Sequence, residues 1–354
     1  MSDGSSPRPF LKSTSSVDSD MDRSNYSTRS TGSDGKHLTS SRFYDSAALA
    51  SQFSSLTTSA KGAHAKDDKD QALPLATIRI YGMDREGIDL ALCQLLHGHG
   101  CSISHAEQHR DRDANCFFQR IQFDYSTMHT DQLSLEYGVQ EVCTRFRMEF
   151  QLNWGARPKR ICIFVSKYEH VLWDILLQRA DLDCEIPLVI SNHEDLRHVA
   201  EAFGIRFEVF KITKDTKRAQ EDKEIALMKE LDIDLVVLAR YMQIVSDDFC
   251  DAFANRVINI HHSFLPAFIG SKPYHRAYDR GVKLIGATAH YATANLDEGP
   301  IIEQNIERCS HRDSVDDLLR KGRAVEKRVL MTALRAHIED RVIVYGNKTV
   351  VFED

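Results

Sequence analysis

The sequence has no excess of positive charge and no apolar run long enough to cross a bilayer. Its 45 lysines and arginines are outnumbered by 52 aspartates and glutamates, which gives a formal net charge of −7. Binding to nucleic acid phosphates or anionic lipid favours a basic patch, and a spanning helix needs about 20 consecutive apolar residues. We therefore expect neither a nucleic-acid partner nor a membrane partner.

Paired metal-binding spacings are also absent from the sequence. The eight cysteines are scattered through apolar segments, with no CxxC pair and no Cys/His spacing of the zinc type. Such cysteines are typical of reduced core residues, and none lies in a motif that would lower its pKa and favour a thiol nucleophile. We therefore expect no metal site and a chemistry that does not depend on cysteine.

Three segments of different composition follow one another along the 354 residues. Residues 1–70 are dominated by serine and threonine and cannot bury enough apolar surface to offset the entropy of the chain. They are interpreted as a disordered tail or a targeting segment, which leaves the compartment open between the cytoplasm and an organelle such as the mitochondrion. Residues 71–156 and 157–354 are predicted to form two folded domains.

The first folded segment has the pattern of a small α+β domain. In chain order it predicts strand 75–81, helix 88–96, strands 102–109 and 116–123, helix 130–145 and strand 147–152. This βαββαβ order is that of the ferredoxin-like fold. The turn that follows the first strand, DREG, resembles the opening of an ACT domain, a regulatory module that binds amino acids. The resemblance implies an effector such as methionine or glycine near Asp84 and Gly87, and a homo-oligomer.

The second folded segment alternates buried strands with helices. Its predicted strands are 160–165, 187–190, 207–212, 235–239 and 257–261, and its predicted helices are 171–178, 195–203 and 218–231. Strands regularly separated by helices favour a doubly wound α/β fold with a mostly parallel sheet. Ligands in such folds bind in the crevice at the carboxyl ends of the strands.

Two polar residues lie at the end of the last of these predicted strands. Because side chains alternate along a strand, Asn259 and His261 project to one face, while the isoleucine before each projects to the other. Asn and His need hydrogen-bond partners in a buried strand, so the pair indicates a functional site. Two satisfied polar residues where a strand meets a loop would give the same pattern, and Asp297 taken alone is typical of an ordinary turn.

Several motifs in this segment carry a resemblance to a known family. They are NIH (259–261) followed by SFLP (263–266), LDEGPII (296–302), LARYMQI (238–244), HHSFLPAF (261–268) and the ending GNKTVVF (346–352). The first three are similar to the active-site signature of the formyltransferase fold that uses 10-formyltetrahydrofolate. The others resemble the formyltetrahydrofolate deformylase family in particular.

The resemblance implies hydrolysis of 10-formyltetrahydrofolate to formate and tetrahydrofolate, in one-carbon metabolism and purine biosynthesis, without a metal or cofactor. It implies a triad in which Asn259 and His261 stabilise the oxyanion and Asp297 assists proton transfer from water. His262 and His290 match no triad position and are interpreted as structural. The substrate-binding residues that it implies are Arg240, Tyr241, Met242, Gln243, Ile244, Ala292, Thr293 and Leu296.

Two other functions would share much of this pattern. A glycinamide ribonucleotide formyltransferase has the same triad but holds a phosphate, usually on a glycine-rich turn after its first strand. This sequence has SKYEH (166–170) at that place, with no glycine and with the carboxylate of Glu169. We expect this loop to line the acceptor side of the crevice and to disfavour a phosphate. The second alternative, a folate or amino-acid sensor with a vestigial triad, is disfavoured by the intact triad residues.

Overall fold

The structure is a computed structural model that describes residues 73–213, 215–267 and 272–353. The tail predicted over residues 1–70 lies outside the described residues, so its interpretation stays a prediction. Among the described residues, no helix is long and apolar enough to span a membrane.

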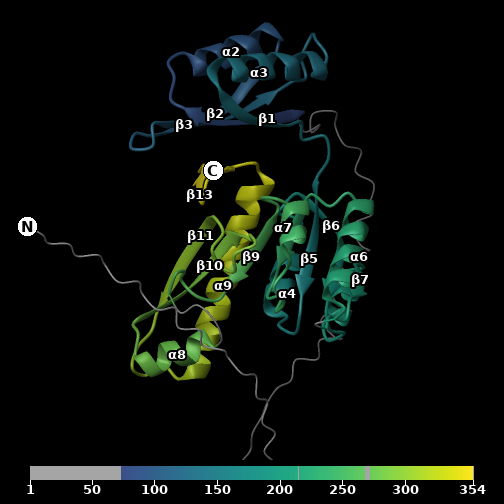
Figure 1. Ribbon diagram of the computed structural model, residues 1–354, viewed down its shortest axis with the longest axis vertical. Helices are drawn as coiled ribbons and strands as arrows, with labels where there is room; N and C mark the ends of the chain where they lie inside the picture. The colour runs from purple at the N-terminus through teal and green to yellow at the C-terminus, as the bar shows by residue number, and fades with distance from the viewer. Residues whose placement is uncertain (1–72, 214, 268–271, 354) are drawn as a thin grey trace, which may run out of the picture. The chain divides into compact units, whose positions relative to one another are not determined.

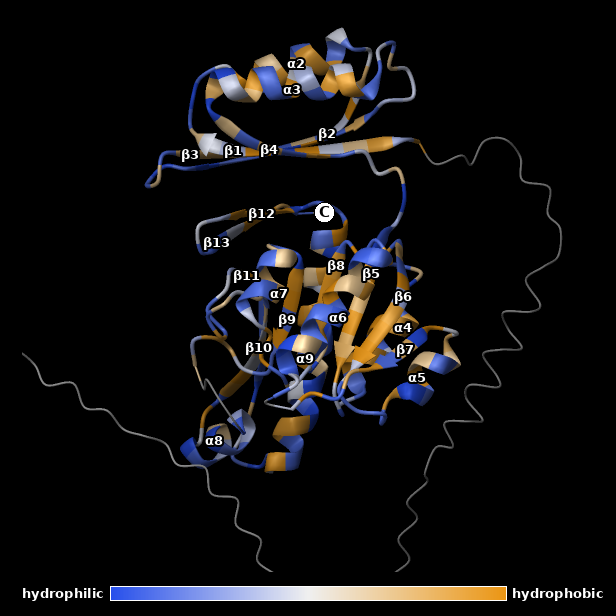
Figure 2. Ribbon diagram, turned by 45° about the vertical axis from the view of Figure 1, so that its right-hand side comes forward, coloured by the Kyte–Doolittle hydropathy of each residue, from blue (hydrophilic) through white to orange (hydrophobic). Residues whose placement is uncertain are grey.

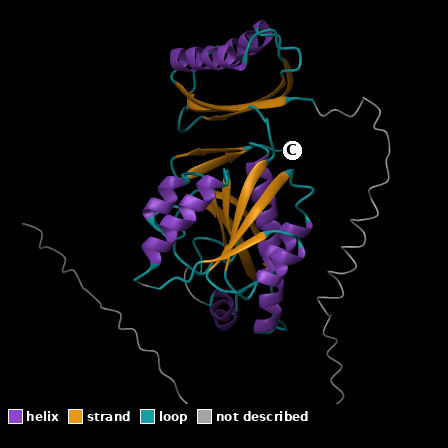
Figure 3. Ribbon diagram, turned by 90° about the vertical axis from the view of Figure 1, so that its right-hand side faces the viewer, coloured by secondary structure: helices purple, strands orange, loops and turns teal. Residues whose placement is uncertain are grey.

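The first folded part, residues 73–156, is a four-stranded antiparallel sheet with two helices on one face (Figure 3). Its elements are β1 (Leu75–Met83), α2 (Ile88–Gly98), β2 (Ser102–Asp111), β3 (Cys116–Asp124), α3 (Gln132–Phe146) and β4 (Met148–Asn153). The strands lie in the order β2-β3-β1-β4. Ile78 and Ile80 of β1 pack with Leu92 of α2 and Val139 of α3 in one buried cluster. The predicted βαββαβ order and ferredoxin-like plan are therefore confirmed.

The second folded part is built around a seven-stranded sheet in the order β11-β10-β9-β8-β5-β6-β7 (Figure 1). Its strands are β5 (Lys159–Val165), β6 (Cys184–Ser191), β7 (Arg206–Val209), β8 (Leu235–Leu238), β9 (Val257–His261), β10 (Leu284–Tyr291) and β11 (Ile301–Arg308). The pairings among β5 to β9 are parallel, whereas β10 pairs antiparallel with both β9 and β11. The predicted mostly parallel sheet is therefore confirmed.

Helices cover both faces of this sheet. They are α4 (His170–Leu177), α5 (Arg197–Ala202), α6 (Lys217–Glu230), α7 (Asp247–Ala252), α8 (Pro273–Arg280) and α9 (Val315–Ile338), and a hairpin of β12 (Val342–Tyr345) and β13 (Lys348–Val351) follows. Along β5, Ile161 and Ile163 join a core cluster with α4, α5 and α9, whereas Phe164 joins another with α6 and α7. Figure 2 shows the apolar strands of this sheet between helices that carry polar residues. Burial on both faces explains why these strands read as continuous apolar runs.

The 24-residue helix α9 is absent from the sequence-based interpretation. It begins with a capping box formed by Ser314 and Asp317 and then buries a long face that includes the charged residue Glu326. One carboxylate does not remove the amphipathic pattern of the helix, so its apolar residues at helical spacing were the signal that could have found it. This helix turns out to carry a residue of the site described below.

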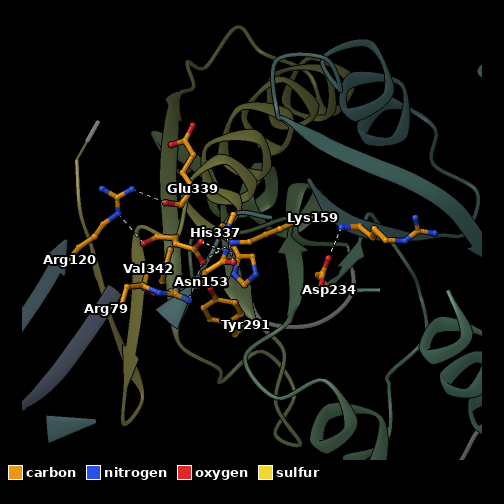
Figure 4. Close-up of polar contacts among 12 residues, drawn as sticks. Arg79, Arg120, Asn153, Lys159, Asp234, Tyr291, His337, Glu339 and Val342 are labelled. Carbon is orange, nitrogen blue, oxygen red and sulfur yellow. Dashed lines mark hydrogen bonds and ion pairs between the residues drawn. The ribbon is translucent and has the colours of Figure 1, made fainter. Parts of the chain in front are cut away.

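A buried carboxylate, that of Asp340, follows α9 and gathers polar side chains from distant segments. Its oxygens lie 3.1 Å from Arg79 Nη2 of β1 and 2.7 Å from Lys159 Nζ of β5, and Asn153 Nδ2 donates to it at 2.5 Å. Lys159 also donates to the carbonyl of His337 (Figure 4). Burial alone would raise the pKa of Asp340, but the two cations outweigh it and hold that pKa below its ordinary value.

Candidate active site

A cavity of about 510 Å³ opens where β8 and β9 end, as expected for a sheet of this kind. Its volume lies in the range that suits a small organic ligand. Asn259, His261 and Asp297 all line it, so the structure brings the three predicted triad residues together. The eight predicted substrate-binding residues line it too: Arg240, Tyr241, Met242, Gln243, Ile244, Ala292, Thr293 and Leu296.

The amide of Asn259 is held by a histidine on the neighbouring strand. In the antiparallel register of β9 and β10, His290 lies opposite Asn259, and its Nε2 is 3.1 Å from Asn259 Nδ2. The other ring nitrogen, Nδ1, lies 3.0 Å from the carbonyl oxygen of Tyr291. Because a carbonyl only accepts, Nδ1 carries the proton and Nε2 accepts from Asn259. Burial lowers the pKa of His290, which favours this neutral form.

His261 and Asp297 form the second pair of the site. His261 Nδ1 lies 3.1 Å from Asp297 Oδ1, and both side chains are almost completely buried. Burial acts to raise the pKa of Asp297, but the hydrogen bond with His261 and the surrounding histidines lower it, so that the carboxylate is ionised at neutral pH. His261 Nε2 is buried and has no hydrogen-bond partner among the described residues. That nitrogen is therefore available to an atom of a ligand.

Asp297 is presented by an unusual backbone conformation. Its φ is 59°, in the left-handed region that Asp tolerates better than most residues. The turn is tight, because a side chain at Gly299 would clash with the carbonyl oxygen of Tyr291. Gly299 therefore allows the loop to return directly into β11, with the Asp297 side chain in the cavity.

His262 also lines the cavity. Its ring stacks on His261 with 5.2 Å between the centroids and lies 6.2 Å from the ring of Tyr274. Burial, followed by the nearby charge of Arg240, lowers the pKa of His262 to about 3, so it stays neutral. A neutral, packed ring accords with the structural interpretation.

The walls of the cavity combine apolar side chains with fixed backbone groups. Met242 and Ile244 are 54% and 57% exposed although both are large and apolar, which is typical of a surface that a ligand covers. The backbone of Met242 donates to Ser166 Oγ at 3.0 Å, which ties this segment to the loop after β5.

The residues predicted to bind an effector lie in the first folded part, at the turn between β1 and α2. Asp84 forms an ion pair with Arg110 at 3.2 Å. Gly87 has a φ of 86° and occupies the position before the first residue of α2, where its lack of a Cβ permits the turn. Neither lines the cavity that holds the triad. Effector binding there stays a prediction.

The sequence analysis did not assign several residues of this cavity to the site. His290 was interpreted as structural, yet it lies 3.8 Å from Asp297 as well as contacting Asn259. The alternation of β10 opposite β9 was the signal that could have found it. Tyr274, Leu319 and Lys272 also line the cavity. They come from α8, from α9 and from the position before α8, and no local motif marks them.

Comparisons with known proteins agree with this site. A family model described as formyl transferase matches residues 159–334. The chain is 48% identical to a formyltetrahydrofolate deformylase of Synechocystis sp. over 279 residues, which is 78% of this chain and 98% of the relative. The chain belongs to the formyltetrahydrofolate deformylase family. The resemblance read from the motifs is therefore confirmed, and the family is one of hydrolases.

Solved structures of both deformylases and transferases resemble this chain. A crystal structure of a formyltetrahydrofolate deformylase from Pseudomonas syringae pv. tomato has 42% identity and a TM-score of 0.77, over 80% of this chain and 96% of that one. A glycinamide ribonucleotide transformylase from Symbiobacterium toebii has 30% identity and a TM-score of 0.53, over 57% of this chain and 98% of that one. The transferase therefore resembles a smaller part of this chain than the deformylase does.

Proposed function

We propose that this chain hydrolyses 10-formyltetrahydrofolate to formate and tetrahydrofolate, with water as the acceptor of the formyl group. The proposal rests on two pairs of side chains that lie in one cavity. Asn259 is oriented by His290, and His261 is oriented by Asp297. Both leave a hydrogen-bonding group free for a ligand. The deformylase names of the relatives support the same substrate.

In the proposed mechanism, Asn259 and His261 stabilise the tetrahedral oxyanion. Attack of water on the formyl carbon places a negative charge on the former carbonyl oxygen. One N–H of Asn259 is engaged with His290, so the second N–H is free to donate to that oxygen. His261, when doubly protonated, donates to Asp297 from Nδ1 and to the oxyanion from Nε2. Each such donor is typically worth about 100- to 1000-fold in rate.

Asp297 is proposed to assist the proton transfers. Its carboxylate is ionised, lies within reach of His261 and lines the cavity. It would orient the attacking water, accept a proton from it and pass a proton toward N10 as the C–N bond breaks. Such general acid and base assistance contributes about 100- to 10,000-fold.

The substrate is proposed to lie against the segment that follows β8 and against the loop before β11. Apolar side chains of Met242, Ile244 and Leu296 line the cavity there and would cover the flat rings of the folate. The mechanism needs neither a metal nor a cofactor. We expect an excess of chelator to leave the rate unchanged.

The direct test is to incubate the purified protein with 10-formyltetrahydrofolate and no other acceptor, and to measure formate. The proposal requires catalytic release of formate together with tetrahydrofolate. A protein that binds the folate without releasing formate would instead be a sensor. No formate without an amine, and release of tetrahydrofolate once an amine is added, would indicate a transferase.

The division of the chain into 1–70, 71–156 and 157–354 is also proposed, with an ACT-like regulatory role for the middle part. The separate apolar cores of the two folded parts support it. We propose an amino-acid effector such as methionine or glycine near Asp84 and Gly87, and a homo-oligomer. Light scattering and kinetics with both amino acids test this. A monomer indifferent to both would remove the proposal.

The compartment is proposed to be the cytoplasm, which the bacterial origin of the relatives supports. A targeting role for residues 1–70 would change this assignment. Fusing these residues to a fluorescent reporter and locating it in cells distinguishes the two.

A further inference from the structure

The loop after β5 places an aromatic ring beside the triad. Tyr168 lines the same cavity as Asn259 and Asp297, and it is 45% exposed. The guanidinium of Arg240 lies over the Tyr168 ring, 5.0 Å from its centroid. The two side chains come from the ends of neighbouring strands, β5 and β8, and are called here the acceptor-side wall. A stack of this kind restrains both side chains.

A single buried carboxylate anchors this wall. Glu326 of α9 accepts a hydrogen bond from Tyr274 at 2.8 Å, contacts His170 Nε2 at 2.8 Å and lies 3.6 Å from Arg240 Nε. Its side chain is 1% exposed. The hydrogen bond with His170 and the charge of Arg240 are among the interactions that lower the pKa of Glu326 despite its burial. One buried negative charge thus contacts groups from three separate segments, of which Tyr274 and Arg240 line the cavity.

Close packing between α8 and α9 brings Tyr274 to this anchor. A side chain at Gly322, one helical turn before Glu326, would clash with the hydroxyl of Tyr274. Only glycine at that position lets Tyr274 approach the helix and reach Glu326. The hydroxyl of Tyr274 is therefore hydrogen-bonded to Glu326, and the guanidinium of Arg240 forms an ion pair with the same carboxylate.

We propose that the acceptor-side wall, anchored by Glu326, determines that water and not an amine accepts the formyl group. This inference rests on the proposed hydrolysis and adds the reason for its acceptor specificity. Tyr168 and Arg240 occupy space beside the triad that an amine-bearing substrate needs, while a water molecule is small enough to pass. The positive charge of Arg240 also disfavours the approach of a protonated amine.

The two competing reactions differ only in the nucleophile. In hydrolysis, a water oxygen bonds to the formyl carbon, the bond from that carbon to N10 breaks, and N10 gains a proton. In transfer, an amine nitrogen forms the new bond, loses a proton and leaves as a formamide, while N10 again gains a proton. No oxidant, reductant or further reactant is needed in either case, so access alone can decide between them.

The test opens the wall and offers a small amine. Tyr168→Ala, Tyr168→Phe and the wild type are each incubated with 10-formyltetrahydrofolate and glycinamide, and formate and formylglycinamide are measured together after subtraction of the uncatalysed rates. Tyr137→Ala, which removes a tyrosine that is 68% exposed on α3, is the surface control. We expect the ratio of formylglycinamide to formate to rise at least about tenfold in Tyr168→Ala. In Tyr168→Phe and Tyr137→Ala it should stay at the wild-type value.

Glu326→Gln tests the anchor through the same ratio. The amide keeps a partner for Tyr274 but removes the charge that holds Arg240, so the ratio should rise in the same direction as in Tyr168→Ala. A purely structural role would lower both products by one common factor and leave the ratio unchanged. That result would remove Glu326 as a positioning residue.

The inference is overturned if Tyr168→Ala still releases formate but its ratio of formylglycinamide to formate equals that of the wild type. Loss of both products in a folded Tyr168→Ala would also overturn it, because the ring would then serve the reaction itself. A wild type that releases no formate would contradict the proposed function instead, so the two failures are distinguishable.

Discussion

Hydrogen bonds at His290 determine how Asn259 presents its amide to the cavity. The carbonyl of Tyr291 fixes the proton on Nδ1, so Nε2 must accept, and the amide nitrogen of Asn259 faces it. An amide turned the other way would present its oxygen to the developing oxyanion and repel it. The rate should therefore depend on a residue that makes no contact with the formyl group.

Replacing His290 with Phe tests this dependence. The ring volume is kept and the acceptor is lost, so we expect kcat to fall by about 10- to 100-fold, as is typical when a catalytic group is slightly misplaced, with little change in KM. His311→Phe, at an exposed position, is the matched control. An unchanged kcat in His290→Phe would show that Asn259 is oriented without it.

The triad itself makes a stronger prediction. Asp297→Asn and His261→Ala should each retain less than about a tenth of the wild-type rate of formate release, because each removes a group proposed to act on the reacting atoms. Both variants should remain folded, which thermal melting checks. A folded variant with near wild-type turnover would assign the chemistry to another group.

The catalytic roles of Asn259, His261 and Asp297 stay a prediction. At this scale the sequence did identify, through its local motifs and the family that they resemble, residues that line one cavity, because short motifs are properties of neighbouring residues. It did not predict the partners of those residues. His290 and Glu326 are 31 and 156 positions away from the residues they hold, Asn259 and His170. Such contacts depend on strand register and helix docking, which no short motif encodes.

Among the elements, α6 combines a charged sequence with a buried face. It buries Glu221 and Glu224, and Glu221 accepts a hydrogen bond from the backbone of Ser246 at 3.1 Å. Burial, together with the charge of Glu221, raises the pKa of Glu224 from its ordinary value of 4.5 to about 8. One carboxyl of this pair is therefore protonated near neutral pH.

The pKa of Glu224 makes stability depend on pH. Because the folded state holds the proton more tightly than the unfolded state, the stability gained is fully present below about 4.5 and is lost as the pH rises through about 8. Glu224→Gln should remove this loss, so that its stability relative to the wild type improves between pH 5 and pH 8 by on the order of a few kcal/mol. Urea unfolding at both pH values measures it. A difference that is constant with pH would contradict the buried, protonated carboxyl.

The strand boundaries predicted from hydrophobic periodicity agree with the structure at some strands and differ at others. The predicted strands 160–165 and 257–261 match β5 and β9 closely, because their apolar runs are buried on both faces. The last strand before α6, predicted at 207–212, ends earlier, at Val209 of β7. The sequence could not reveal that Glu221 and Glu224 of α6 and Glu326 of α9 point inward, since periodicity assigns charged residues to the exposed face.

At the scale of the whole molecule, ion pairs at Asp340 connect segments that lie far apart in the sequence. Arg79, Asn153 and Lys159 all contact Asp340, and it is 6% exposed. Asp340→Ala would leave two partly buried cations without their counter-charge; removing one partner of a buried pair typically costs about 3 to 5 kcal/mol, so we expect a loss toward the lower end of that range. The free energy of unfolding measures this loss.

The matched control is Asp222→Ala, which breaks an exposed ion pair with Arg218. Exposed pairs contribute about 0 to 1 kcal/mol, so this change should be small. The Asp340 contribution should also vanish as the pH falls, because a lowered carboxyl pKa stabilises only above its unfolded value of about 3.8. If Asp340→Ala lowers the free energy of unfolding no more than Asp222→Ala does, the contacts around Asp340 do not stabilise the fold.

The most direct test of the central claim adds glycinamide ribonucleotide to the reaction. The purified protein is incubated with 10-formyltetrahydrofolate and increasing concentrations of this amine, and formate and formylated product are followed together. We predict that formate is released at a rate independent of the amine, because the loop after β5 offers no glycine turn for the phosphate. Of that loop only Tyr168 lines the cavity, and Glu169 instead accepts a hydrogen bond from Trp173 Nε1, so its predicted repulsion of a phosphate is not part of this expectation. Formyl transfer that outruns formate release would contradict the account and make this protein a transferase.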